Sequence, residues 1–326
     1  MVSISINVVK IGNISLQFNV LLAPMAGVTD LPFRQIVRKF GQFLMYSEMV
    51  ASQAVIRNVT RTRTIMNSAN DPYTAVQLVG ADPKVIADAA RLSYDLGAKI
   101  LDINMGCPVK KIVKTDAGSA LMKDENLAQK IIHAVVNATP LPVTLKIRLG
   151  WDDNHLNAPT IAHIAEDEGI KMVTVHARTR CQLYSGVANW KAVQAVRDVI
   201  KIPLIINGDI TDAEKAKQAL ADSNADGVMI GRGALGQPWI LRDIDNVLNN
   251  KTTEQLSNNE KLNIAKEHIS SVLAFYSKRV AFTLAKKVVM YYCKGRPNAT
   301  KFRAIMSDSS VKTETELFNI LENVFS

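Results

Sequence analysis

Short apolar runs alternate with longer amphipathic stretches through the first three quarters of the chain. Each apolar run stops at a polar residue or a glycine and is bounded by turn signals, which is typical of strands that are buried on both faces of a parallel sheet. The pattern predicts eight such strands, beginning near residues 21, 43, 73, 99, 143, 172, 204 and 227. Helical patterns follow nearly all of them, and we predict helices over residues 84–96, 126–137, 159–168, 190–199 and 213–221.

Eight strand–helix units within about 230 residues favour an α/β fold, a closed (β/α)8 TIM barrel with its helices outside. An open, doubly wound sheet is the alternative, although no Gly-x-Gly-x-x-Gly follows the first strand. Residues 3–20 predict a small hairpin that turns at Gly12-Asn13 and closes the bottom of the barrel.

The pattern changes after residue 245. We expect residues 1–245 to form the barrel domain, 246–259 a linker rich in Asn, Thr and Ser, and 260–326 a small helical domain. The helical runs cover residues 260–276, 280–294, 298–307 and 314–323.

Most of the net charge of +9 lies in this helical domain. Between His268 and Ser307 there is no acidic residue, and aromatic residues are interspersed among the basic ones. The basic residues are Lys278, Arg279, Lys286, Lys287, Lys294, Arg296, Lys301 and Arg303. This stretch favours a nucleic-acid surface, with a merely solvated basic face as the alternative.

The composition indicates a soluble protein, which we expect in the cytoplasm and not in a membrane. Hydrophobic residues make up 48% of the chain, but no run approaches eighteen apolar residues and the amino terminus lacks the pattern of a signal peptide. Cys107, Cys181 and Cys293 are widely spaced and odd in number, so neither a disulfide framework nor a metal site is indicated.

Residues at the ends of the predicted strands, most of them polar, should meet at the mouth of the barrel. They are Pro24, Glu48, Gln77, Asn104, Lys146, His176, Asn207 and Gly231. Lys146 and Gln77 suit the edge of a flavin ring, whereas a structural ion pair for Lys146 and a plain hydrogen-bonding role for His176 are the alternatives. The loops at 207–209 and 231–233 combine glycine with a following helix and would bind a phosphate, with tight turns as the alternative.

Cys107 lies in a Gly-Cys-Pro turn directly after a strand end. Gly106 permits a tight bend and Pro108 delays any helix, so the thiol is expected on a rigid loop. A thiol with a reference pKa of about 8.5 is mostly protonated near neutrality and can act as a general acid. A buried structural cysteine is the alternative.

Seven motifs, taken together and in this order, resemble the tRNA-dihydrouridine synthases, and most closely their bacterial B-type branch. The motifs are Pro24-Met25-Ala26-Gly27-Val28-Thr29-Asp30 with Pro32-Phe33-Arg34, Ser47-Glu48-Met49, Asp102-Ile103-Asn104-Met105-Gly106-Cys107-Pro108, Leu145-Lys146-Ile147-Arg148, His176-Ala177-Arg178-Thr179-Arg180, Asn207-Gly208-Asp209-Ile210 and Met229-Ile230-Gly231-Arg232-Gly233. The chain departs from the family at Val288, where relatives commonly have a histidine.

The resemblance implies an FMN-binding barrel and a helical tRNA-binding domain that together reduce the 5,6 double bond of selected uridines with NADPH. It implies that Cys107 is the general acid, that Asn104 orients the uracil, and that Arg178 and Lys110 contact the base or its phosphate. Lys286 and Lys287 are expected to bind tRNA. The residues implied to hold FMN are Ala23, Pro24, Met25, Gln77, Lys146, His176, Asn207, Gly208, Asp209, Gly231 and Arg232.

Two other functions are alternatives. An FMN barrel acting on a free pyrimidine or a small enone, such as a dihydroorotate dehydrogenase, would leave the basic helical domain unused. An RNA-binding protein without a redox step would have no need of Cys107, Lys146 and the two glycine-containing loops. The sequence gives neither the uridine that is reduced nor the oligomeric state, although we expect a monomer when the protein is free.

Overall fold

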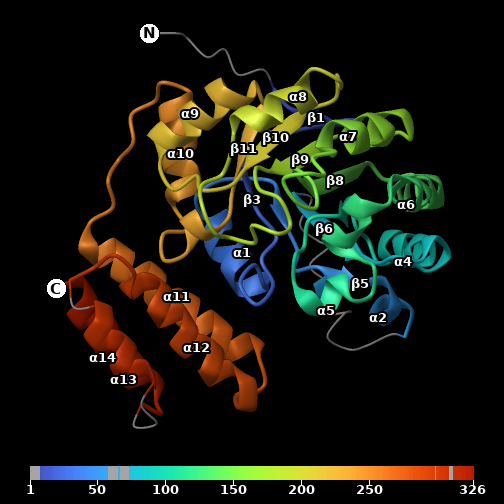
Figure 1. The fold of residues 1–326 in the computed structure, drawn as a ribbon. Coiled ribbons are helices and arrows are strands. Elements are labelled where there is room, and N and C mark those ends of the chain that lie inside the picture. The colour runs from blue at the N-terminus through green and yellow to red at the C-terminus, as the bar shows by residue number, and fades with distance from the viewer. Residues whose placement is uncertain (1–7, 58–64, 67–72, 298, 308–310) are drawn as a thin grey trace.

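The computed structural model describes residues 8–57, 65–66, 73–297, 299–307 and 311–326. Its larger part is a closed barrel of eight parallel strands, which confirms the predicted TIM-barrel fold (Figure 1). The ring closes because β4 pairs with β3 on one side and with β6 on the other. The barrel strands are β3 (Val20–Leu22), β4 (Met45–Tyr46), β6 (Thr74–Val79), β7 (Ile100–Asn104), β8 (Val143–Arg148), β9 (Val173–His176), β10 (Leu204–Asn207) and β11 (Gly227–Ile230).

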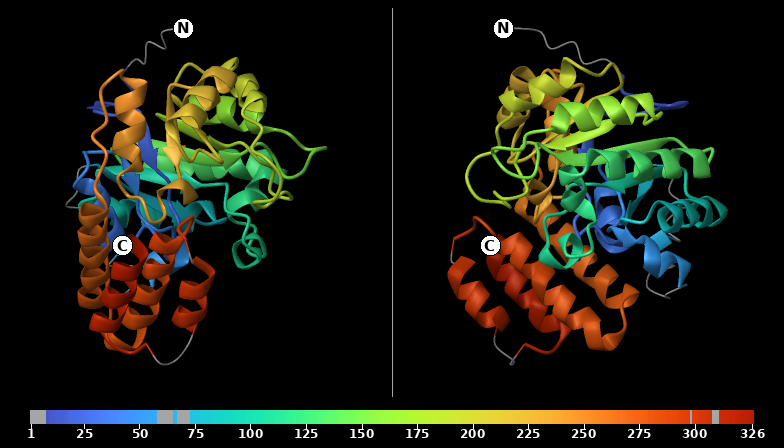
Figure 2. Two further views of the ribbon diagram at one scale, coloured as in Figure 1. Left: turned by 90° about the vertical axis from the view of Figure 1, so that its left-hand side faces the viewer. Right: turned by 45° about the vertical axis from the view of Figure 1, so that its right-hand side comes forward.

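Helices surround the barrel (Figure 2). Asp30 caps the first of them by accepting a hydrogen bond from the backbone N of Phe33, and Asp82 caps the helix after β6 in the same way. The helices are α1 (Leu31–Arg38), α2 (Ser52–Ile56), α4 (Pro83–Asp95), α5 (Lys110–Val113), α6 (Glu125–Ala138), α7 (Ala158–Asp167), α8 (Gln194–Arg197), α9 (Ala213–Ser223) and α10 (Ile240–Leu248). Short 3₁₀ helices are η2 (Gly118–Lys123), η3 (Lys191–Val193) and η4 (Arg232–Ala234).

Two details differ from the sequence-based expectation. The helix predicted over 190–199 is divided between η3 and the four-residue α8, and a short strand, β5 (Val50–Ala51), pairs with β6 beside the barrel. Neither change moves a barrel strand from its predicted place.

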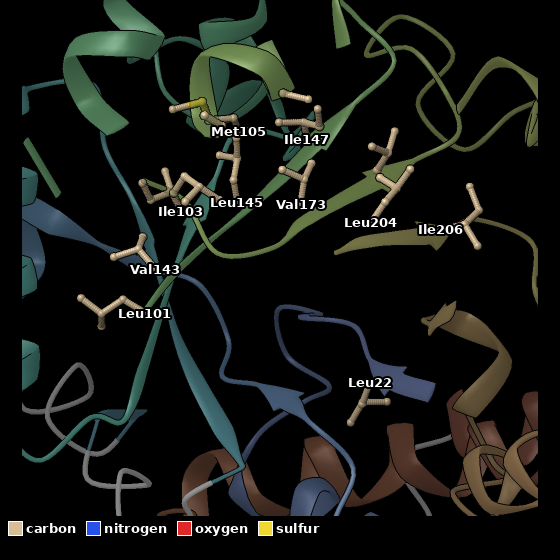
Figure 3. Packing of buried hydrophobic residues seen from close by; sticks show 14 of the residues in the cluster. Leu22, Leu101, Ile103, Met105, Val143, Leu145, Ile147, Val173, Leu204 and Ile206 are labelled. Carbon is tan, nitrogen blue, oxygen red and sulfur yellow. The ribbon is translucent and has the colours of Figure 1, made fainter. Parts of the chain in front are cut away.

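Alternation along the strands decides which side chains reach the barrel interior. On β8, Val143, Leu145 and Ile147 belong to the apolar core that packs against the surrounding helices (Figure 3). Side chains in a strand point alternately to opposite faces, so Thr144 and Lys146 point inward. The same alternation places Gln77 of β6, Asp102 and Asn104 of β7, His176 of β9 and Asn207 of β10 inside the barrel.

The amino-terminal hairpin consists of β1 (Lys10–Ile11) and β2 (Ile14–Ser15). Ile11 and Leu16 share a buried cluster with the interior barrel residues Leu21, Ile205 and Met229. The hairpin therefore closes the barrel floor as predicted, while residues 3–7 of that prediction lie outside the described residues.

The carboxyl-terminal helices pack around their own apolar core at one end of the molecule (Figures 1 and 2). They are α11 (Asn258–Phe275), α12 (Lys278–Cys293), α13 (Ala299–Ser307) and α14 (Glu314–Phe325). Because α10 continues to Leu248 and α11 begins at Asn258, the connection covers 249–257 and is shorter than the expected 246–259. Asn298, where the third helix was expected to begin, and the Arg303 side chain lie outside the described parts.

The helical part rests on the barrel beside the first strand–helix loop. The Tyr276 hydroxyl donates to Oδ2 of Asp30 at 2.9 Å, and Lys287 Nζ donates to the carbonyl of Gly27 at 3.0 Å. A second contact joins the loop after η4 to the end of α12, where a Cβ atom on Gly236 would lie 2.1 Å from the carbonyl oxygen of Tyr291. Among the described helices, none is long and apolar enough to cross a membrane.

Candidate active site

A cavity of about 550 Å³ opens at the carboxyl ends of the barrel strands. All eleven residues expected to hold the cofactor line it, and so do Asn104 and Cys107. The eleven are Ala23, Pro24, Met25, Gln77, Lys146, His176, Asn207, Gly208, Asp209, Gly231 and Arg232. Residues that are separated by two hundred positions in the sequence thus form one site, because parallel strands bring their carboxyl ends to one rim.

The loop of Cys107 is held on three sides. The Asn104 carboxamide oxygen accepts from the backbone N of Cys107 at 2.9 Å, and the Ser119 hydroxyl donates to the Cys107 carbonyl at 2.9 Å. Nε of Arg148 donates to the carbonyl of Gly106 at 2.8 Å. These bonds confirm the expected fixed loop and leave the thiol at the cavity wall.

The surroundings keep this thiol protonated. Burial raises the pKa of Cys107, while a backbone N–H from Val109 and the cations Arg148 and Lys146 oppose the rise. The thiol is therefore protonated at neutral pH and able to donate a proton, and the same two cations oppose the rise in pKa because they favour a thiolate.

Lys146 is the central cation of the cavity. Its Nζ donates to Oδ1 of Asn207 at 3.1 Å, and Asn207 in turn donates to the carbonyl of Met229 at 2.8 Å. Burial, together with the neighbouring Arg148, lowers the pKa of Lys146 to about 8. Within the described part of the chain Lys146 forms no ion pair with a carboxylate, so its charge remains directed at the cavity and the alternative of a structural ion pair loses support.

His176 stays neutral at this position. Burial and the surrounding cations, Lys146 first among them, lower the pKa of His176 well below its ordinary value. A neutral imidazole can donate one hydrogen bond and accept another, so His176 offers the cavity a hydrogen-bonding edge and not a charge.

A chain of side-chain hydrogen bonds crosses the cavity floor. Gln77 Nε2 donates to Oδ2 of Asp102 at 2.6 Å, and Asn104 Nδ2 donates to Oε1 of Gln77 at 2.8 Å. Asp102 is completely buried, and Thr144 donates to its other oxygen at 2.6 Å. Burial raises the pKa of Asp102 to about 7 in spite of these bonds and of the nearby Lys146.

The last two strand-end loops pack tightly on one another. Gly233 lies so near the 207–211 loop that a Cβ atom there would come within 2.5 Å of the Ile210 carbonyl oxygen. Arg232 is about half exposed and its guanidinium lies 3.4 Å from Oδ1 of Asp209. These loops bring glycine-containing backbone and one arginine to the rim, a combination that can bind an anion.

Arg178 does not line the cavity, contrary to the expectation that it contacts the substrate. Its side chain is 1% exposed and donates to both carboxylate oxygens of Asp209, at 3.0 and 2.5 Å, and to the carbonyls of Ser185 and Gly186. Although burial opposes it, these bonds and the one from Ala188 hold the pKa of Asp209 below its usual range. Arg178 therefore fixes the loop after β9, and each of its three guanidinium nitrogens donates at least one hydrogen bond.

The other predicted polar residues lie outside the cavity. Glu48 is buried and accepts from the backbone N of Gly27 at 2.6 Å, so it shapes the first loop at the barrel mouth and does not line the cavity itself. Lys110 is exposed at the start of α5, next to the cavity-lining Val109. Lys286 and Lys287 lie on α12 with their cations over Phe282 and Tyr291, respectively.

Three charged or aromatic residues also line the cavity, although sequence reasoning gave them no role there. Arg148 lies two positions after Lys146, so strand alternation could have placed it inside the barrel. Tyr184, on the loop after β9, has its ring near Arg148 and Arg232, with cation-to-centroid distances of 5.5 and 5.0 Å. Lys294, directly after α12, brings a cation from the helical part to the barrel mouth.

Comparison with known proteins decides the family. The family model described as "Dihydrouridine synthase (Dus)" matches residues 21–325. This chain belongs to the dihydrouridine synthase family. The matched range includes the barrel, the cavity and the carboxyl-terminal helices.

Relatives within the family are similar over nearly their full length. A "Probable tRNA-dihydrouridine synthase" of Rickettsia conorii is 51% identical over 306 residues, which cover 92% of this chain and 91% of that protein. A "tRNA-dihydrouridine synthase B" of Pseudomonas syringae pv. tomato is 44% identical over 316 residues, 96% of this chain and 94% of the relative. The resemblance found from the seven motifs, to the family and to its B-type members, is thereby confirmed.

A solved structure outside the family shares the fold. Histamine dehydrogenase from Rhizobium sp. 4-9 superposes with a TM-score of 0.59 at 10% identity, over 82% of this chain. This chain spans half the length of that structure, and at this identity the likeness concerns the barrel fold alone.

The position at which this chain departs from the family is buried. Val288 is 6% exposed and belongs to the apolar core of the carboxyl-terminal helices. The side chain at this position therefore packs within the helices and does not face solvent.

Proposed function

We propose that the protein reduces the 5,6 double bond of specific uridines in tRNA. The observation that carries this proposal is the Cys107 thiol, held on a fixed loop at the wall of a cavity that Lys146 also lines. Family membership and the names of the relatives support the substrate class. We expect the reaction in the cytoplasm, by a protein that is monomeric when free.

FMN is the proposed cofactor and NADPH the proposed reductant. The cavity volume lies within the range of cofactor sites, its floor offers N–H donors to an electron-rich ring, and Arg232 with the two glycine-containing loops offers an anion site. The eleven cavity residues named above would hold the cofactor. When bound and reduced, FMN supplies the hydride that uracil C6 receives.

The side chains of the protein supply the rest of the chemistry. Cys107 donates the proton to uracil C5, and the resulting thiolate is stabilised by Arg148 and Lys146 until solvent returns a proton. Asn104 lies between the Cys107 loop and Gln77 and orients the base. This use of Cys107 needs a protonated thiol, in accordance with its raised pKa.

The target base must leave the tRNA stack to enter the cavity. Flipping a nucleotide costs a few kcal/mol, which backbone contacts offset. We assign the barrel domain, which ends with α10 at Leu248, to catalysis and the helical domain, which begins with α11 at Asn258, to tRNA binding. Lys110, Lys286 and Lys294 are the proposed phosphate contacts, whereas Lys287 holds the helical domain on the first barrel loop and Arg178 positions the loop after β9.

Single-turnover oxidation of the NADPH-reduced protein tests the proposal. The flavin absorbance is followed with and without tRNA that lacks the modification, and dihydrouridine is assayed in the product. Reoxidation that tRNA accelerates, with dihydrouridine formed, is the expected result. Reoxidation unaffected by tRNA would assign the cavity to a smaller substrate, and a purified protein without flavin absorbance would favour RNA binding alone.

A further inference from the structure

Asp102 is a fully buried carboxylate that the proposed reaction does not use. It extends from β7 into the barrel, below the cavity, and has no exposed surface. One oxygen accepts from the Thr144 hydroxyl and the other from Nε2 of Gln77, both at 2.6 Å. Burying such a group has a free-energy cost, so its presence calls for a specific role.

The hydrogen-bond chain beyond Asp102 has a defined direction. Oε1 of Gln77 accepts from Nδ2 of Asn104 at 2.8 Å, and Oδ1 of Asn104 accepts from the backbone N of Cys107 at 2.9 Å. A side-chain amide turned by 180° keeps its shape but exchanges its donor and acceptor ends. The backbone N–H at one end only donates. At the other end Oδ2 of Asp102 accepts in either protonation state, because a proton on the carboxyl group can lie on Oδ1, which faces Thr144 Oγ1. Both amides therefore satisfy all these bonds in a single orientation.

We propose that Asp102 is a positioning residue that fixes the side-chain amides of Gln77 and Asn104 so that both present N–H groups to the cavity. Each amide nitrogen has two N–H groups, and the chain uses one of each. Among the described residues the second N–H of each amide has no protein acceptor, and both side chains line the cavity. Together with Lys146 they form a wall that donates hydrogen bonds.

A cavity wall that carries only hydrogen-bond donors favours ligands that present acceptors to it. Carbonyl oxygens and unprotonated ring nitrogens complement it, whereas an amino group facing it would leave donors opposed to donors. The inference rests on the proposed function in assigning these acceptors to a flavin ring and a uracil. The orientation of the two amides is independent of that assignment.

Two substitutions at Asp102 separate the roles that a buried carboxylate can have. Asp102→Asn removes the charge but keeps an oxygen for Gln77, since its amide nitrogen can donate to Thr144 Oγ1. Asp102→Leu keeps the branched shape and the number of heavy atoms and removes the acceptor. If the acceptor is what matters, Asp102→Asn retains product formation within about threefold, and Asp102→Leu loses about 5- to 150-fold, the factor expected for a buried donor left unpaired.

The experiment measures dihydrouridine formation in single turnover and the ¹⁵N side-chain amide signals of Gln77 and Asn104 in the flavin-loaded protein. We expect both signals to keep their positions in Asp102→Asn and to shift or broaden in Asp102→Leu. Equal loss in both variants would assign the role to the charge, and equal retention would assign it to packing. Either result overturns the proposal.

A matched control and a rescue keep the test valid if Asp102→Leu does not fold. Thr144→Val removes the other hydrogen bond to the same carboxylate and should leave both amide signals in place, so signal shifts as large as those of Asp102→Leu would contradict the proposal. Gln77→Glu places two carboxyl groups opposite each other and should displace the Asn104 amide signal. Adding Asp102→Asn restores a donor opposite the new glutamate, and the Asn104 signal should then return to its position. A signal that does not return would refute the coupling of Asp102 to Asn104 through residue 77. Because the signals need no turnover, a wild-type protein inactive on tRNA would refute the proposed function alone.

Discussion

Gly236 lies where the barrel and the helical domain meet backbone to backbone, and its substitution by alanine should separate them. The residue has φ of +74°, and an added Cβ would lie 2.1 Å from the carbonyl oxygen and 2.6 Å from the carbonyl carbon of Tyr291. These are backbone atoms at the end of α12, so no side-chain rotation can relieve the clash. Gly295 offers a matched control, because its φ is +75° and nothing lies within 4 Å of an added Cβ.

Gly236→Ala and Gly295→Ala both place alanine at a positive φ, and only Gly236→Ala also brings its Cβ against backbone atoms. A non-glycine residue in the left-handed region costs about 1 kcal/mol, which both variants should lose. Forcing a methyl group into a closed contact adds about 1–3 kcal/mol, which Gly236→Ala alone should lose. We therefore expect a loss of about 2–4 kcal/mol for Gly236→Ala and of about 1 kcal/mol for Gly295→Ala.

Thermal unfolding and tRNA turnover provide the assay. At about 2–4 °C per kcal/mol, the melting temperature of Gly236→Ala should fall several degrees further than that of Gly295→Ala. The displaced end of α12 also carries Lys294 away from the cavity, so tRNA-dependent flavin reoxidation should slow while the flavin content stays unchanged. Equal melting temperatures and equal turnover in the two variants would refute the reasoning.

Three other predictions concern single groups. Cys107→Ala should retain flavin and RNA binding but lose about 10²- to 10⁴-fold in the rate of product formation. Near-normal turnover would show that Cys107 is not the general acid. In the wild type the rate should fall only as alkaline pH deprotonates the thiol. Lys286→Gln with Lys294→Gln should weaken tRNA binding and reduce the slope of log affinity against log salt by about 1 for each phosphate that is no longer neutralised, and an unchanged slope would assign both lysines to a solvated face. Burial raises the pKa of Asp102 to about 7, so between pH of about 4 and about 7 the folded protein holds a proton that the unfolded chain has released. Asp102 should therefore make the free energy of unfolding decrease as the pH rises through this range. Denaturant unfolding of Asp102→Asn should lack this part of the decrease, and an unchanged pH profile would contradict the prediction.

Most of the site was predictable because the carboxyl ends of all the barrel strands lie on one rim. Once eight parallel strands are inferred, the residues at their carboxyl ends must be neighbours, and Gln77, Lys146 and Asn207 follow from that rule alone. The same rule places Glu48 beside the other strand ends, but its side chain does not line the cavity. Its carboxylate accepts instead from the Gly27 backbone, and no strand periodicity contains that loop contact.

The features that the sequence did not reveal depend on pairing between distant segments. A cation near a strand end looks available to a substrate, but the partner of Arg178, Asp209, lies 31 residues further along the chain. Lys294 stands in the sequence as one of eight basic residues with nothing to distinguish it. It reaches the cavity because Gly236 lets α12 approach the last barrel loop, and a sequence without coordinates does not give that approach.

The loop between β3 and α1 has consequences for how such enzymes diversify. One side of this loop lines the cavity through Pro24 and Met25, and its other side, with α1, meets the helical domain through Gly27, Asp30 and Lys39. The barrel side of this interface therefore lies more than two hundred residues before the carboxyl-terminal helices in the sequence. If only the helical domain were exchanged between relatives, to change the proposed tRNA specificity, it would lack the β3–α1 loop and α1 residues that it contacts. Chimeras that transfer residues 24–39 together with the carboxyl-terminal helices respect the true boundary of the exchangeable unit, which is discontinuous in sequence.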